Sequence, residues 1–196
     1  MTRRLSRAAA LAAALVLGSA PLAAAASPRF DGPTIKNPSV PPDFALRDQA
    51  GRRVDLAGLR GHVVVVTFLY TRCTDVCPLT AERLNSALRS LGPARAKVRV
   101  LAVSVDPKGD TERSVRRFVA VHRLLPEFRY LTGPAAALRR IWAEYGVASL
   151  ARSGDRVDHT LYTLLLDRSL RGRVLFDSTA SSAAVAHDVR LLLGSA

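Results

Sequence analysis

Cysteine is scarce in this sequence: Cys73 and Cys77 are the only two. Iron–sulfur clusters usually take four cysteine ligands, so the count excludes a cluster. A chain of 196 residues is long enough to bury a hydrophobic core without covalent or metal supports. We therefore expect the two cysteines to serve chemistry rather than stability. A purely structural, metal-free role is the alternative.

Aromatic and acidic residues are also few. Aromatics make up 6% of the chain, and 16 Asp and Glu face 29 Lys and Arg, which gives a net charge of +13. A nucleic-acid-binding protein would gather its basic residues on one face among aromatics. Here the arginines are scattered singly, so no nucleic-acid partner is expected. The charge indicates a solvated basic surface, with attraction to an acidic protein or to anionic lipid headgroups as the alternative.

The amino terminus has the pattern of a secretory signal peptide. A basic stretch at 1–7 precedes an apolar run at 8–17, and the alanines at 24–26 fit the A-x-A pattern before a cleavage site. We therefore expect residues 1–26 to be removed from an exported protein that works in the periplasm or another extracytoplasmic space. An uncleaved leader, which would associate the protein with the membrane, is the alternative.

Two further regions follow the leader. Residues 27–40 are rich in Pro, Ser and Asn and have no hydrophobic periodicity, which predicts a flexible linker. Residues 41–196 are expected to form one domain.

Hydrophobic patterning within this domain predicts an α/β fold. The stretch 62–70 is a run of valines suited to a central strand that is covered on both faces. Further strands are expected at 44–46 and 53–56, which form a hairpin turning at Gly51, and at 98–105, 160–166 and 173–176. Helices are expected after Cys77, at 112–122, at 135–145, and from Ser181 or Ser182 to Leu193. This order predicts a thioredoxin-like fold: a central mixed sheet, helices on both faces and an N-terminal hairpin.

Cys73 and Cys77 lie between the first central strand and the following helix, at the edge where open α/β sheets bind ligands. Their spacing lets both sulfur atoms face the same way, so that they can form a disulfide or bind one ion. The free N–H groups of a helix start stabilise thiolates. Soft thiolates select Cu(I) or zinc. Two cysteines and one histidine suit copper, whereas zinc normally takes a fourth ligand.

Four histidines are candidates for that third ligand. A surface or helix-end role is the default for His62, His122 and His187. His159 differs because, in a thioredoxin-like fold, the segment that begins the late strands packs beside the cysteine turn. By itself, a histidine at that position is more often structural than a ligand.

Three blocks strengthen the case for His159. They are Tyr-Thr-Arg-Cys-Thr-Asp-Val-Cys-Pro at 70–78, Ser-Val-Asp-Pro with Asp-Thr at 104–111, and Val-Asp-His-Thr at 157–160. In this order they resemble the Sco/SenC family of copper-binding proteins, which serve assembly of the dinuclear copper centre of cytochrome c oxidase. The resemblance implies that Cys73, Cys77 and His159 bind one copper ion per monomer, as Cu(I) or Cu(II). Gly109 departs from the family, whose members usually have a charged residue there.

The resemblance also implies the partners. The acceptor would be the copper-centre subunit of cytochrome c oxidase, and other copper chaperones or thiol reductants would supply copper or electrons. Such a protein is a metallochaperone rather than an enzyme, although thiol–disulfide reductase activity is compatible with it. The alternative is an exported thiol–disulfide oxidoreductase without metal, in which Cys73 attacks and Cys77 resolves. Asp106 is expected either to orient the site or to cap its loop, and Asp75 and Asp158 to tune the site or to be ordinary exposed acids.

Overall fold

The computed structural model describes residues 29–151 and 157–194, so the expected signal peptide lies outside the described residues. The domain is built around a five-stranded sheet with the order β5-β4-β3-β8-β9. Its strands are β3 (Val63–Leu69), β4 (Val98–Ser104), β5 (Phe128–Leu131), β8 (Tyr162–Leu166) and β9 (Gly172–Asp177). β3, β4 and β5 are parallel, whereas β8 and β9 run antiparallel to their neighbours. The expected mixed sheet is confirmed.

Strand β3 is at the centre of this sheet, and every one of its residues is buried. Val65, for example, pairs with Val100 of β4 on one side and with Leu165 of β8 on the other. A strand covered on both faces needs apolar residues at consecutive positions rather than in alternation. The valine run therefore fixes β3 as the middle of the core, and the cysteine segment begins where β3 ends.

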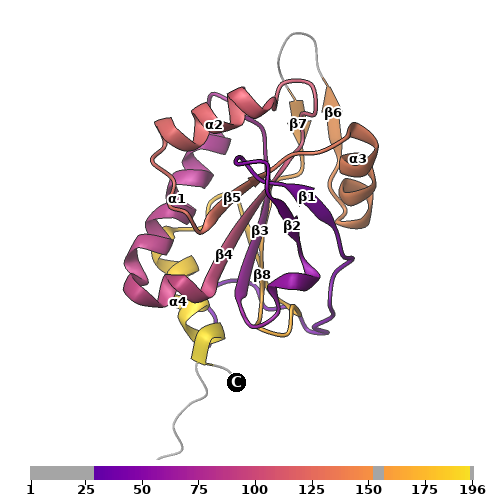
Figure 1. The fold of residues 1–196 in the computed structure, drawn as a ribbon. Coiled ribbons are helices and arrows are strands. Elements are labelled where there is room, and N and C mark those ends of the chain that lie inside the picture. Colours follow the sequence, from indigo (N-terminus) through magenta and orange to yellow (C-terminus); the bar gives the residue numbers. More distant parts are fainter. Residues whose placement is uncertain (1–28, 152–156, 195–196) are drawn as a thin grey trace, which may run out of the picture.

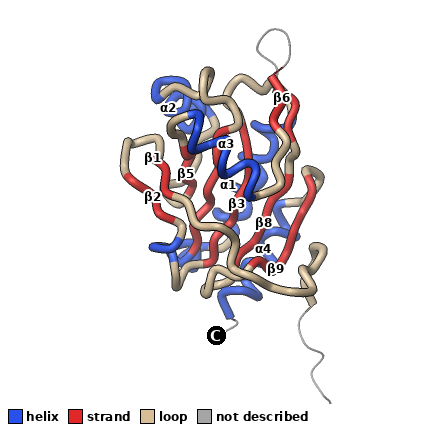
Figure 2. Tube along the Cα trace, turned by 90° about the vertical axis from the view of Figure 1, so that its right-hand side faces the viewer, coloured by secondary structure: helices blue, strands red, loops and turns tan. Residues whose placement is uncertain are grey.

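Helices cover both faces of the sheet (Figures 1 and 2). On one side lie α1 (Val76–Ser90), α2 (Glu112–Val121) and α4 (Ser182–Gly194). On the other lie α3 (Ala135–Glu144) and the hairpin of β1 (Ala45–Arg47) and β2 (Arg53–Asp55). Gly51 in the hairpin turn has the expected positive φ, 75°. Among the described residues, no helix is both long and apolar enough to cross a membrane.

Several short elements were not predicted from the sequence. They are β5, the two 3₁₀ helices η1 (Ala57–Leu59) and η2 (Gly92–Lys97), and the hairpin of β6 (Ser149–Ala151) and β7 (Val157–His159). Segments of three to six residues are too short to show a hydrophobic period. β6 and β7 matter most for the site, because β7 carries His159.

Part of the segment expected to be a flexible linker makes regular contacts with β9. The Ile35 N–H donates to the Arg173 carbonyl at 2.9 Å, and the Gly172 N–H donates to the Ser39 carbonyl at 2.9 Å. Gly32 packs so closely that a Cβ there would lie 2.5 Å from side-chain atoms of Val174 and Phe176. Residues 32–39 therefore lie along the edge strand, because their backbone groups pair with those of β9.

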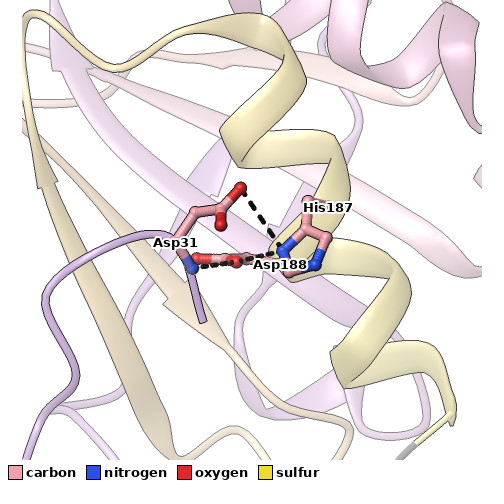
Figure 3. A group of neighbouring side chains, drawn as sticks. All are labelled: Asp31, His187 and Asp188. Atoms are coloured by element: carbon pink, nitrogen blue, oxygen red, sulfur yellow. Dashed lines mark hydrogen bonds and ion pairs between the residues drawn. The ribbon is translucent and has the colours of Figure 1, made fainter. Parts of the chain in front are cut away.

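A buried carboxylate on α4 anchors the start of this segment (Figure 3). Asp188 is fully buried and accepts the N–H groups of Asp31 at 2.8 Å and of Gly32 at 3.0 Å. The Nδ1 atom of His187 lies 3.0 Å from Asp188 and 3.4 Å from the Asp31 carboxylate. These three side chains could together hold a cation. Both oxygen atoms of Asp188 already accept backbone hydrogen bonds, however, so the cluster is explained as an anchor.

Candidate metal centre

The two cysteines lie where the sequence predicts, in the turn between β3 and α1. Cys77 is in the first turn of α1 and is completely buried, whereas Cys73 lies just before the helix and is half-buried. Both thiols are free rather than joined by a disulfide. The site therefore presents one accessible sulfur and one enclosed sulfur.

Hydrogen bonding makes the two sulfur atoms chemically unequal. The Cys77 thiol donates to the sulfur of Cys73, and the backbone N–H groups of Asp75 and Cys77 add to this, so the pKa of Cys73 falls from 9.0 to about 5. The Cys77 N–H is 3.4 Å from Cys73 Sγ. The same thiol–thiolate hydrogen bond, followed by burial, raises the pKa of Cys77 far above its ordinary value. Near neutral pH, Cys73 is therefore a thiolate and Cys77 a thiol.

His159, on the β6–β7 hairpin, approaches the buried sulfur of Cys77. Among the described residues, the donor atoms of Cys73, Cys77 and His159 do not all lie within 4.8 Å of one another. The Nε2 atom of His159 lies 3.7 Å from Cys77 Sγ, and its Nδ1 atom lies 3.1 Å from the Thr160 carbonyl. A carbonyl oxygen only accepts, so Nδ1 carries the proton and the Nε2 lone pair is directed at Cys77. Burial lowers the pKa of His159, which keeps the imidazole neutral. The ring of Tyr70 packs edge-on against it, with centroids 5.7 Å apart.

The resulting donor set is two sulfur atoms and one neutral imidazole nitrogen. Soft sulfur donors favour Cu(I), and an added imidazole also suits Cu(II). The other histidines with described contacts lie elsewhere: His122 pairs with Glu82 at 2.8 Å, and His187 contacts Asp188. The donor chemistry at Cys73, Cys77 and His159 thus fits copper.

A network of hydrogen bonds lies beside the cysteine turn, and its partners were not predicted from the sequence. Thr111 caps α2, its hydroxyl accepting the Ser114 N–H at 3.2 Å. Asp110 is buried instead beneath the turn, where its carboxylate accepts the backbone N–H of Thr71. The motif at 104–111 placed Asp110 near the site, but spacing alone could not identify its hydrogen-bond donors.

The three other acidic residues considered in the sequence, Asp106, Asp75 and Asp158, differ in their burial. Asp106 forms an ion pair with Arg72 at 2.7 Å and is almost completely buried. It also accepts the Gly109 N–H at 2.9 Å, so it caps its own loop as well. Asp75 and Asp158 are exposed.

Because the pKa of the Cys73 thiol is lowered and that of the Cys77 thiol is raised, the two cysteines should be alkylated at different rates. At pH 6.5 iodoacetamide should modify Cys73 first, because only the thiolate reacts and an ordinary thiol is almost fully protonated there. The rate should fall only as pH drops toward about 5, where Cys73 takes up its proton. Peptide mass spectrometry at partial modification measures the order. Equal modification of the two cysteines, or a rate that rises steeply between pH 7 and 9, would contradict the assignment.

Fold and site together define a thioredoxin-like protein with a dithiol–histidine site at the carboxyl end of its central strand. The SCO1/SenC family model matches residues 32–194 of this chain. The protein therefore belongs to the Sco/SenC family.

Individual relatives agree with this assignment. The chain is 34% identical over 131 residues to the mitochondrial SCO2 homolog of Bos taurus, an alignment that covers 63% of this chain and 48% of that protein. The apo Sco1 structure from Thermus thermophilus is 33% identical, with a TM-score of 0.74 over 86% of this chain and 100% of that one. Copper-bound ScoI from Bradyrhizobium japonicum is 28% identical, with a TM-score of 0.69 over 78% and 98% of the two chains. The chain spans about half the length of the cattle protein.

Proposed function

We propose that this protein is a copper metallochaperone that binds one copper ion per monomer through Cys73, Cys77 and His159. It delivers that copper to the dinuclear centre of cytochrome c oxidase. The Sco family is described as a family of cytochrome c oxidase assembly proteins. Copper binding by the relative from Bradyrhizobium japonicum supports the choice of metal.

The observation that carries the proposal is the approach of His159 to Cys77. Their side chains come from elements 82 residues apart in sequence, yet Nε2 lies 3.7 Å from Sγ. In disulfide exchange this lone pair can only accept the Cys77 proton. A soft metal ion held by the cysteines would use it as a further ligand, because a neutral imidazole nitrogen binds metals.

The unequal sulfur atoms suit uptake and release of an ion. Cys73 is already a thiolate and is the more accessible, so it can make the first bond to incoming copper. Cys77 then loses its proton to solvent as the ion takes the place of the thiol hydrogen bond. A cysteine of the acceptor can displace Cys73 by the same accessible side, which gives a route for transfer.

Reduction of a disulfide in the acceptor is a second candidate function, and the lowered pKa of Cys73 and raised pKa of Cys77 favour it as well. The Cys73 thiolate would attack one sulfur of an acceptor disulfide, forming a mixed disulfide and releasing the other sulfur as a thiolate. Cys77 would then give its proton to the released acceptor thiolate and attack the sulfur of Cys73. This step forms the Cys73–Cys77 disulfide and releases the second acceptor sulfur as a thiolate, which takes a proton from water. The acceptor gains two electrons and the protein loses two, so a thiol reductant must restore the pair.

Export fits both functions. The signal-peptide pattern at 1–26 supports placing this protein in the periplasm or another extracytoplasmic compartment, anchored to the membrane if its leader stays attached. Its partners are then the copper-centre subunit of the oxidase, together with copper chaperones or thiol reductants in the same compartment.

Metal analysis of the protein without residues 1–26 tests the proposal. The reduced protein should bind one copper per monomer, and Cu(II) should give intense sulfur-to-copper charge-transfer absorption. His187→Ala is the matched control, because His187 lies in the other cluster of candidate ligands and its loss should leave stoichiometry and spectrum unchanged. Copper that binds without charge-transfer absorption, or that depends on His187, would refute the site. Failure of the loaded protein to transfer copper to the oxidase subunit would refute delivery.

A further inference from the structure

Two buried carboxylates hold the residues that lead into the cysteine turn. Both come from the loop between β4 and α2, and each binds one residue of the pair Thr71 and Arg72. We propose that Asp106 and Asp110 are positioning residues, which set the conformation of Cys73 and thereby the balance between the dithiol and disulfide forms of the site. The inference deepens the proposed function, because it concerns the same two cysteines.

Asp110 fixes Thr71. One carboxylate oxygen accepts both the backbone N–H of Thr71 at 2.8 Å and its hydroxyl at 2.7 Å. The other oxygen accepts the hydroxyls of Ser104 at 2.6 Å and of Tyr130 at 3.0 Å, which ties it to the ends of β4 and β5. Burial raises the pKa of Asp110. Four hydrogen bonds on one buried carboxylate leave Thr71 little freedom relative to the sheet.

Asp106 fixes Arg72, the next residue. One carboxylate oxygen accepts from Arg72 Nε at 2.9 Å and from its terminal nitrogen at 2.7 Å, and the other accepts the Gly109 N–H at 2.9 Å. Two guanidinium donors on one carboxylate define the orientation of Arg72 as well as its position. Cys73 follows directly in the chain, and its N–H lies 3.4 Å from the Tyr70 carbonyl. The turn is therefore held at both of the residues that precede the sulfur.

Gly109 is the residue that makes room for this ion pair. A Cβ at position 109 would lie 2.2 Å from the Asp106 carboxylate and 2.3 Å from Arg72 Nε. Any other residue would therefore force the guanidinium and carboxylate apart. This gives a physical reason for the glycine at position 109: Arg72 occupies the space that a side chain would need.

The network holds the turn in the form with separate thiols. A disulfide requires the two sulfur atoms to approach to about 2.05 Å, whereas here the thiols are separate and the Cys77 N–H lies 3.4 Å from the sulfur of Cys73. Loosening Thr71 or Arg72 lets Cys73 move toward Cys77. Loss of the network should therefore favour the disulfide over the dithiol.

The test is the equilibrium of the metal-free protein with glutathione. In this exchange two glutathione thiols give up two electrons and two protons to form glutathione disulfide, and the protein S–S bond becomes two thiols. Asp106→Asn and Asp110→Asn are each expected to shift the equilibrium constant toward the protein disulfide by about tenfold or more. Asp48→Asn is the matched control: Asp48 is equally buried and pairs with Arg52 and Arg129, but it lies in the β1–β2 hairpin.

Gly109→Ala disturbs the same ion pair without removing a charge. It replaces Asp106→Asn or Asp110→Asn in the test if either of these variants fails to fold. It should produce a shift of the same sign, whereas Gly58→Ala should not, because a Cβ at 58 meets only the Asp55 Cβ at 3.8 Å. The charge-transfer band of Cu(II) should also move in the network variants. Shifts no larger than those of Asp48→Asn and Gly58→Ala, in variants of equal thermal stability, would overturn the proposal. The glutathione measurement needs no metal, so it stands even if the protein proves not to bind copper.

Discussion

Replacement of Cys73 and Cys77 by serine should abolish specific copper binding. A hydroxyl is a hard donor that stays protonated near neutral pH, so it does not replace a soft thiolate toward Cu(I). The loss of affinity should exceed the roughly 100-fold that removal of an outer contact to a metal ligand costs. Competition with a Cu(I) chelator measures the affinity, and the charge-transfer absorption of Cu(II) should vanish at the same time.

The matched control for this variant is Ala81→Ser. Ala81 is fully buried one turn further along α1, so its replacement also buries a hydroxyl but leaves both sulfur atoms in place. It should bind copper as the unmodified protein does. Copper that stays bound at one ion per monomer in the double serine variant would place the site elsewhere, and the Asp31–His187–Asp188 cluster would be the first position to examine.

The single variant Cys77→Ser should have a metal-free effect as well. The largest cause of the low pKa of Cys73 is the hydrogen bond from the Cys77 thiol. A serine hydroxyl at 77 is shorter and donates from a different position, so the pKa of Cys73 should rise toward its ordinary value. Alkylation of Cys73 at pH 6.5 should then slow.

His159→Ala should weaken Cu(II) binding by more than the roughly 10-fold that loss of even an outer contact to a ligand costs, and Cu(I) binding by less. Cu(I) can be held by two soft thiolates, whereas Cu(II) prefers to keep a nitrogen ligand. The disulfide equilibrium of the cysteines should change little, because an imidazole that only transfers a proton changes the rate of exchange and not its equilibrium constant. Paired titrations with Cu(I) and Cu(II), together with the glutathione equilibrium, measure all three quantities.

The pH at which copper binding weakens tests whether His159 is a ligand. Burial lowers the pKa of His159 below 6.5, so the imidazole stays neutral to a lower pH than an exposed histidine. Proton competition at this ligand should therefore be absent above about pH 6.5 and should appear only in more acidic solution. That acidic component should be missing from His159→Ala. It should persist in His122→Ala, since His122 is paired with Glu82.

Unchanged affinities in His159→Ala would contradict the three-ligand site. The accessible thiolate of Cys73 and the enclosed thiol of Cys77 would then be left as a redox pair, and thiol–disulfide exchange would become the leading function.

Much of the fold follows from local pattern. The valine run of β3 is apolar at every position because a central strand is buried on both faces, and this fixes where the cysteine segment leaves the sheet. The positive φ values of Gly51 and of Gly146, just beyond the end of α3 at Glu144, follow from residue type alone. β5 and the β6–β7 hairpin could not be predicted in this way, because three or four residues carry no period and pair only where a neighbouring strand is already in place.

The sequence by itself determined the chemistry available to the site: two thiols at a helix start, one histidine in the matching family block and glycine at 109. The tertiary structure decided how those groups are used. It directs His159 Nε2 at Cys77, makes Cys73 the thiolate and Cys77 the thiol, and attaches the turn to Asp106 and Asp110. Residue types and spacing specify which atoms can donate or ligate. Distances, burial and hydrogen-bond partners arise only when segments far apart in the chain pack together.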